Sequence, residues 1–167
     1  VTLPGGELFT ALQTGVIDAT EWVGPYNDLT FGFHQAAKYY YYPGWHEPGS
    51  MLELLINIDE WNSLPKHLQV IIETASKAVN QDILDEYTAR NNTALVELVN
   101  VHNVQLRKLP DDVIAEFKVI ANDILEENAA KDPTVNKVYQ SYKKFKEEVT
   151  AYHKVSEDAF IEARSDK

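Results

Sequence analysis

The hydrophobic positions divide the sequence into two regions of different character. Residues 1–57 are rich in Gly, Pro and aromatic side chains and show few long periodic patterns, which predicts short strands and helices joined by turns. Residues 58–167 contain few helix breakers, and Pro65, Pro110 and Pro133 each stand where the first turn of a helix tolerates a proline. The second region is therefore predicted to be mainly helical.

The longest apolar stripe runs at helical spacing from residue 65 to about residue 101. Its members are Leu68, Ile71, Ile72, Ala75, Ala78, Val79, Ile83, Tyr87, Ala94, Leu95 and Leu98. A continuous helix of this length would extend for about 50 Å, which is more than a small domain needs to cover its own core. We therefore expect a helix that bridges two domains.

Shorter patterns predict the remaining elements of an α/β chain. An amphipathic helix is expected to end at Gly15, because glycine readily adopts the left-handed conformation that stops a helix. Segments rich in β-forming residues predict strands over 16–24, 39–43, 51–57 and 103–110. Helical patterns predict helices over 5–15, 110–131 and 133–164, with a short helical or irregular segment over 28–38.

Composition and charge exclude several classes of function. A net charge of -11 argues against a nucleic-acid partner, because proteins that bind phosphate backbones carry clustered Lys and Arg. No apolar run approaches the roughly 18 residues of a membrane-spanning helix. The absence of cysteine excludes disulfides and thiolate chemistry. The opening VTLPGGELF has neither an initiator Met nor a signal peptide, so we expect a processed or partial product.

Candidate chemistry first appears at the end of the predicted strand over 16–24. Glu21 stands beside Trp22 and is followed by Gly24 and Pro25, an arrangement that displays a carboxylate at the rim of a cleft. The same pattern also fits an ordinary strand end, with Glu21 in water and Trp22 in the core.

A second candidate lies in residues 43–49, PGWHEPG, where Trp45, His46 and Glu47 stand between two Pro–Gly pairs. Such turns restrict the backbone, so the side chains between them lose little freedom when a ligand binds. Taken alone, His46 is more typical of a hydrogen-bonded surface histidine than of a metal ligand.

Glu21 and Glu47 thus lie on separate rigid aromatic loops. If the loops converge, the two glutamates could act as the acid and base of a hydrolase, as in glycoside hydrolysis. They could equally provide oxygen ligands for a hard cation such as Na⁺ or Ca²⁺. The spacing does not choose between these alternatives, and a helical interaction module whose aromatic residues only form a core is a third.

Residues 4–49 and 51–75 closely resemble the C-terminal half of TRAP (tripartite ATP-independent periplasmic) transporter solute-binding proteins, the DctP-like family. Within this family the chain is most similar to the branch that binds 2-oxoacids and lactate. The resemblance implies a periplasmic-binding-protein-like fold with two domains that close on an organic anion. It also implies a periplasmic location, delivery of the anion to the membrane permease, and no enzymatic activity.

By position, the resemblance assigns a cation and ligand site to three residues. Glu21 and Glu47 would contribute carboxylate oxygens to a Ca²⁺ or Na⁺ ion that bridges to the anion. Trp22 would contribute its main-chain carbonyl to the cation and its ring to the pocket wall. The aromatic residues would then shape and dry a small pocket, while the cation makes an acidic surface acceptable to an anion.

The chain departs from the family pattern in one respect. The family's anion-binding arginine and most of its first domain lie upstream of the matching motifs, and Arg90, Arg107 and Arg164 stand far from those motifs in the sequence. We therefore expect this chain to hold half a site, to bind ligand weakly alone, and to need the N-terminal part of the same protein.

The last helical stretch carries an aromatic stripe that suits a helix-mediated homodimer, as in the oxoacid branch. Its members are Tyr139, Tyr142, Phe145, Val149 and Tyr152. Packing of these side chains on their own domain is an equal alternative.

Overall fold

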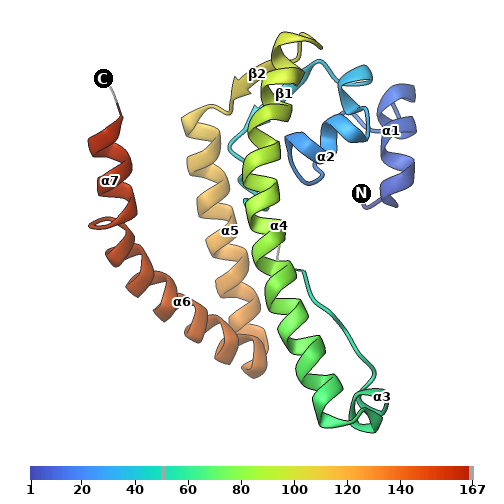
Figure 1. The fold of residues 1–167 in the computed structure, drawn as a ribbon. Helices are drawn as coiled ribbons and strands as arrows, with labels where there is room; N and C mark the ends of the chain where they lie inside the picture. Colours follow the sequence, from blue (N-terminus) through green and yellow to red (C-terminus); the bar gives the residue numbers. More distant parts are fainter. Residues whose placement is uncertain (50–51, 166–167) are drawn as a thin grey trace. The chain divides into compact units, whose positions relative to one another are not determined.

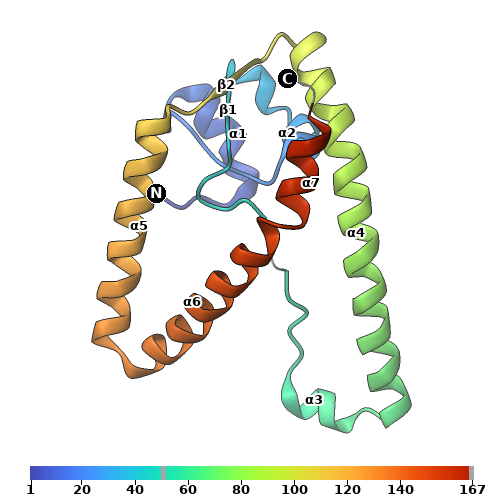
Figure 2. The same cartoon turned by 90° about the vertical axis from the view of Figure 1, so that its left-hand side faces the viewer.

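The computed structural model describes residues 1–49 and 52–165. The chain divides into two compact units, Val1–Leu109 and Pro110–Lys167, and Figures 1 and 2 show their elements in two views. No helix in the described ranges combines the length and apolar character that a membrane crossing requires.

The first unit contains a two-stranded parallel sheet. Strands β1 (Tyr39–Tyr42) and β2 (Gln105–Lys108) pair with Tyr39 opposite Gln105. The unit's helices are α1 (Gly5–Thr14), α2 (Pro25–Thr30), the 3₁₀ turn η1 (Phe33–Gln35), α3 (Ile58–Ser63) and α4 (Lys66–Asn100). Its core comprises Leu8, Ala11, Phe33, Ala94, Leu98 and Val104, and Leu98 is the most buried of these at 2% exposure.

The long helix predicted over 65–101 is confirmed as α4, which has 35 residues and extends for about 52 Å at 1.5 Å per residue. Helix α2 packs against α4, and Ala94 and Leu98 are buried near the C-terminal end of α4. Toward its N-terminus the predicted stripe is exposed, with Ile71 at 59% and Val79 at 52%. Half of the apolar face of α4 therefore has no cover within the described chain.

The predicted strand over 16–24 is wrong, because the end of α1 turns the chain. Gly15 adopts the left-handed conformation at φ 74°, as expected. The backbone N–H groups of Val16 and Ile17 both donate to the carbonyl oxygen of Ala11, which ties them to the last turn of the helix. These β-forming residues follow a helix stop and have no neighbouring strand to pair with.

The predicted strand over 51–57 is also wrong where the structure describes it, since Met51 lies outside the described residues. Residues 52–57 contain no strand, and Leu52 and Leu55 are 80% and 86% exposed. β-forming side chains yield a stable strand only when a partner supplies hydrogen bonds and packing. No such partner for this segment exists in the described part of the chain.

Over residues 110–165 the second unit contains three helices, α5 (Asp111–Lys131), α6 (Pro133–His153) and α7 (Glu157–Arg164). Asp132 caps α6 by accepting hydrogen bonds from the N–H groups of Thr134 and Val135. The helix predicted over 133–164 is interrupted after His153. There the Ser156 N–H bonds three residues back, and its hydroxyl donates to the Tyr152 carbonyl oxygen at 2.9 Å. The same hydroxyl bond from Ser76 to the Ile72 carbonyl oxygen leaves α4 continuous, so this bond does not explain the break.

Candidate functional site

Trp22 lies against the first turn of α1. Gly5 leaves room for the indole, since a Cβ atom at Gly5 would lie 2.6 Å from Cη2 of Trp22. The indole also lies beside Phe31, with ring centroids 5.1 Å apart, and the Phe31 ring in turn lies 5.7 Å from that of the buried Phe33. The indole Nε1 is buried and has no hydrogen-bond partner among the described residues. The Trp22 ring is thus half-buried and held by packing.

The loop that carries Glu21 and Trp22 is attached to α4 through Asn91. Gly24 precedes Pro25 at the start of α2 and has no side chain to cap that helix. Instead Asn91 Oδ1 accepts a hydrogen bond from the Tyr26 N–H at 2.9 Å. A Cβ atom at Gly24 would lie 3.2 Å from the same oxygen, so the close approach favours glycine. Asn91, 65 residues away in sequence, therefore caps α2 and fixes the end of the loop.

Asp28, on α2, is the one charged or polar residue that is buried in the described chain, at 8% exposure. The Tyr40 hydroxyl donates a hydrogen bond to Asp28 Oδ2 at 2.5 Å. Burial raises the pKa of Asp28, against the lowering effect of the Tyr40 hydroxyl and of the nearby Val23 and Gly24 backbone. Its Oδ1 is buried without a hydrogen-bond partner among the described residues. Burial and the nearby Asp28 also raise the pKa of Tyr40.

The turn over 43–49 follows β1 and returns toward the loop of Glu21. His46 Nε2 lies 3.3 Å from Glu21 Oε2, with 36% and 55% of the two side chains exposed. The ring of Trp45 meets that of His46 edge-on, at 5.5 Å between centroids. Glu47 is exposed on the same turn. The structure thus brings the two predicted loops together through a residue, His46, that residue type alone had suggested to be an ordinary surface histidine.

The donor chemistry fits a hard cation but is incomplete within this chain. Carboxylates of Glu21 and Glu47 and a main-chain carbonyl at Trp22 are the oxygen ligands that Ca²⁺ prefers, and Ca²⁺ takes about six to eight of them. Within residues 1–49 and 52–165, no three His, Cys, Asp or Glu side chains are grouped to hold a metal ion. A cation at these loops would need further ligands from the anion, water or another segment.

The arginines of the first unit are engaged elsewhere. Arg90 forms an ion pair with Glu86 at 2.6 Å and lies over the Tyr26 ring. Arg107 lies over the Tyr39 ring at 3.9 Å and donates to the Gln105 side chain. That another part of the protein provides the anion's arginine stays a prediction.

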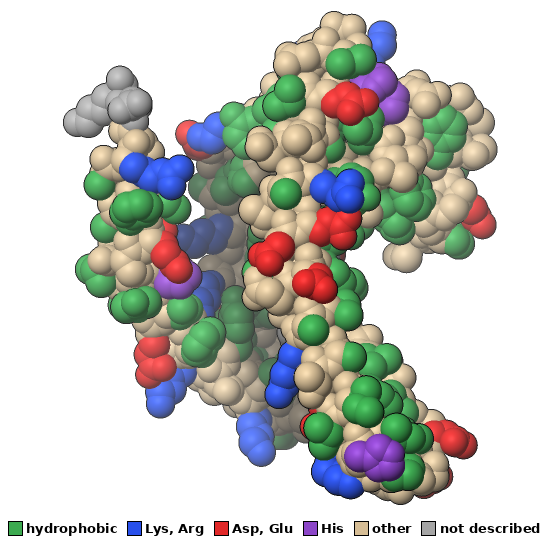
Figure 3. Space-filling view, viewed as in Figure 1, with side chains coloured by type: hydrophobic (Ala, Val, Ile, Leu, Met, Phe, Trp, Pro, Cys, Tyr) green, Lys and Arg blue, Asp and Glu red, His purple; other side chains and the backbone are tan. Residues whose placement is uncertain are grey.

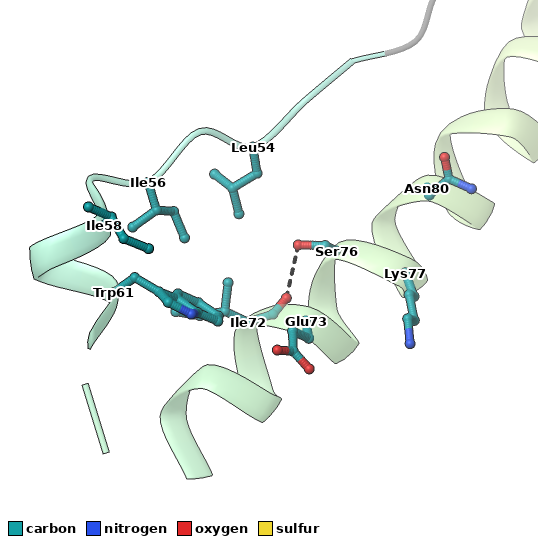
Figure 4. A pocket seen from close by; sticks show the side chains of 9 residues that line it. All are labelled: Leu54, Ile56, Ile58, Trp61, Ile72, Glu73, Ser76, Lys77 and Asn80. Carbon is teal, nitrogen blue, oxygen red and sulfur yellow. Dashed lines mark hydrogen bonds between the residues drawn. The ribbon is translucent and has the colours of Figure 1, made fainter. Parts of the chain in front are cut away.

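A second concave surface lies between the extended segment 52–57, helix α3 and the start of α4. This groove of about 730 Å³ is lined by Leu54, Ile56, Ile58, Trp61, Ile72, Glu73, Ser76, Lys77 and Asn80. Figure 4 shows its apolar side chains pointing toward one another, and Figure 3 shows hydrophobic side chains gathered on the α3 end of the surface. The groove is apolar and open, unlike the acidic loops of Glu21 and Glu47.

Comparison with known proteins establishes the family. Residues 1–132 match the family described as bacterial extracellular solute-binding protein, family 7 (DctP), and the chain belongs to this family. It is 43% identical over 155 residues to the monocarboxylate 2-oxoacid-binding periplasmic protein all3028 of Nostoc sp., covering 93% of this chain and 42% of that protein. Members are solute-binding proteins of transporters and not enzymes, so the hydrolase alternative for Glu21 and Glu47 finds no support.

Two solved structures share the fold. A TRAP periplasmic solute-binding protein from Colwellia psychrerythraea, with bound calcium and pyruvate, has a TM-score of 0.91 and 40% identity, over 98% of this chain and 50% of that one. A TRAP transporter solute-binding protein from Bordetella bronchiseptica, a mixed-occupancy dimer with copurified calcium and picolinate, has a TM-score of 0.91 and 32% identity, over 98% and 48%. The chain thus has the α/β fold of TRAP solute-binding proteins and spans about half the length of these relatives or less.

Proposed function

We propose that the protein containing this chain captures a small 2-oxoacid such as pyruvate, or lactate, for a TRAP transporter and delivers it to the membrane permease. The sequence relative is named for 2-oxoacid binding, and the Colwellia structure contains pyruvate. The periplasmic names of these relatives support the same location for this protein.

A bound cation is the second part of the proposal. Both solved relatives contain calcium, and a divalent ion suits two carboxylates because they neutralise its charge. We assign Glu21 and Glu47 as carboxylate ligands and the Trp22 carbonyl as a third, with Na⁺ as the alternative ion. The ion would allow a negatively charged 2-oxoacid to approach an acidic surface. The residues of this chain would position the ion, while the Trp22 and Trp45 rings limit the access of water.

One observation carries this proposal above all others, the contact between His46 and Glu21. It joins two loops that are 25 residues apart in sequence and carry all three assigned residues. Because Glu21 is exposed and its partner is a histidine, a cation could replace His46 at the carboxylate without opening a buried core.

Calorimetric titration of pyruvate into the full protein tests the assignment. We expect pyruvate to bind in the presence of Ca²⁺ and to bind more weakly after a chelator is added. We expect binding to be lost in Glu21→Gln and in Glu47→Gln. Glu116→Gln, at an exposed position on α5, is the matched control and should bind like the wild type. Equal affinity in the chelated and calcium-loaded proteins would remove the cation from the account. No binding under any condition would refute 2-oxoacid capture.

We further propose that another part of the same protein completes the fold and the site. The relatives are about twice as long as the region matched, and the groove at α3 has no cover in the described chain. We expect Leu54→Asp, at a side chain 65% exposed here, to destabilise the full protein strongly and the 167-residue chain little. The reason is that a carboxylate would be buried only where the groove is covered. Ile120→Asp on α5 is the control. If Leu54→Asp lowers the stability of both proteins by the same small amount, the groove is not covered by another part of the full protein.

The aromatic stripe of α6 supports a homodimer. Tyr142, Phe145 and Tyr152 are 52%, 65% and 65% exposed, so their own unit does not bury them. Sedimentation of the full protein should give a dimer that Phe145→Ser converts to monomer, whereas Lys143→Ser leaves it intact. A monomeric wild type at micromolar concentration would contradict this part of the proposal.

A further inference from the structure

We propose that Asp28 is a positioning residue that holds the Glu21–Trp22 loop and the 43–49 turn in register, so that the site of the proposed function is formed before ligand arrives. The inference rests on that function, but Asp28 belongs to neither predicted loop. It is a buried carboxylate on the helix that lies between them in sequence.

The contacts of Asp28 reach both sides of the site. Its Oδ2 accepts from the hydroxyl of Tyr40 in β1, the strand that leads directly into the 43–49 turn. The backbone N–H of Asp28 donates to the Gly24 carbonyl oxygen at 2.9 Å, at the point where the Glu21–Trp22 loop enters α2. Through its backbone and its side chain, one residue therefore connects the end of one loop to the strand that begins the other.

The burial of Asp28 argues that it has more than a structural role. A carboxylate at 8% exposure loses most of its hydration, and a neutral side chain of similar shape would avoid that cost. No basic side chain forms an ion pair with it in the described chain, and the charge of Glu21 also raises its pKa. What the carboxylate supplies is a short hydrogen bond of fixed direction to Tyr40, since charged acceptors bind short and tightly.

Preformed geometry is what a cation site requires. Ca²⁺ ligands from separate loops must meet at about 2.3–2.6 Å from one ion. Loops that first have to be ordered lower the affinity by the cost of ordering them. A single buried residue that ties α2 to β1 restrains the two loops that adjoin them and reduces this cost. The His46–Glu21 contact is then a consequence of the same arrangement.

The test combines a direct measure of loop position with binding, in the full protein. Spin labels at Thr20→Cys and Gly44→Cys report the separation of the two loops. The 167-residue chain has no native cysteine, and any cysteine elsewhere in the full protein would be replaced by serine. Thr20 is exposed, and a Cβ atom at Gly44 meets its first neighbour, the Glu47 carbonyl oxygen, at 3.8 Å. Pulsed EPR is recorded for wild type, Tyr40→Phe, Asp28→Asn and the control Tyr26→Phe.

Tyr26→Phe is matched because it removes a hydroxyl from the same helix, and that hydroxyl forms no hydrogen bond within the described residues. We expect the interspin distance distribution to broaden in Tyr40→Phe and Asp28→Asn but not in Tyr26→Phe. Affinities for Ca²⁺ and pyruvate, measured well below the melting temperature, should fall about tenfold in the first two variants, the change that follows from losing one charged hydrogen bond.

The outcomes separate this inference from the proposed function. A wild type that binds neither Ca²⁺ nor pyruvate refutes the function, while the EPR comparison still decides whether Asp28 holds the loops. An unchanged distance distribution in both variants overturns the positioning role. A broadened distribution with unchanged affinities also overturns the positioning role, because loosening the two loops would then have no effect on ligand binding. Affinity lost only in proportion to thermal stability would reduce Asp28 to a structural residue.

Discussion

Gly5 and Gly6 provide a matched pair of positions for testing how the Trp22 side chain packs on α1. Both glycines lie in the first turn of α1, so substitution by alanine should gain a similar amount of helix propensity, about 0.5–1 kcal/mol at most. A Cβ atom at Gly6 has nothing within 4 Å, whereas a Cβ atom at Gly5 would lie 2.6 Å from Cη2 and 3.1 Å from Cζ3 of Trp22. The two substitutions therefore differ mainly by their effect on the indole.

The expected magnitude follows from the packing around that ring. An indole that moves away from Gly5 meets Phe31, whose centroid is 5.1 Å away and which itself lies against Phe33. Overpacking of this kind costs about 1–3 kcal/mol. Because the propensity gain is common to both variants, Gly5→Ala should be less stable than Gly6→Ala by that amount.

Two assays follow from this reasoning. Urea denaturation of the full protein should place Gly6→Ala at or slightly above wild type and Gly5→Ala below both. Calorimetric titration of pyruvate with Ca²⁺ should show a weaker affinity for Gly5→Ala alone, since moving the ring also moves the Trp22 backbone that is assigned to the cation. Equal stabilities and affinities for the two variants would refute the packing of Trp22 on α1.

Three further predictions concern the first unit and are measured by denaturation of the full protein. Leu98→Ala, at the most buried side chain, should lower the free energy of unfolding by about 2–5 kcal/mol; a loss below 1 kcal/mol would contradict its place in the core. Gly15→Ala should cost about 1 kcal/mol because φ is 74° there, and Gly6→Ala is the control that should cost nothing. The raised pKa of Asp28 means that the native state holds its proton at a higher pH than the unfolded state does. The stability of wild type relative to Asp28→Asn should therefore rise as pH falls from 7 through this raised pKa toward 3.8. A stability difference between the two proteins that stays constant over this pH range would contradict the burial of the carboxyl group.

The helices were predictable because their signals are local. The apolar period from residue 65, the prolines at helix starts and the glycine at position 15 each act within a few residues. They correctly predicted α1, α4 and α5 to within a few residues. The break between α6 and α7 was missed because no proline or glycine marks it in the sequence.

Strands were predictable only where a partner exists. The tyrosines of β1 and the segment that forms β2 pair with each other. The equally β-prone residues 16–24 and 52–57 have no strand beside them in the described chain. Among the four tyrosines of β1, Tyr40 alone is half-buried, and Tyr39, Tyr41 and Tyr42 are exposed at 48%, 49% and 44%. Residue type gives the propensity for a strand, and the rest of the fold decides whether it forms.

The candidate site shows the same division. Glu21, Trp22 and Glu47 were identified from two short segments, and their assignment as cation ligands stays a prediction. The residues that hold those segments in place, Asn91 and Asp28, carried no recognisable signal, because a capping amide 65 residues away or a buried acid on a short helix is visible only in three dimensions.

The most direct test of the account is a crystal structure of the full protein grown with Ca²⁺ and pyruvate. The account predicts one calcium ion within about 2.3–2.6 Å of carboxylate oxygens from Glu21 and Glu47 and of the Trp22 carbonyl oxygen, in contact with the pyruvate. The His46–Glu21 contact should be altered by the ion. Pyruvate bound away from these loops, or bound there without any cation, would contradict the central claim.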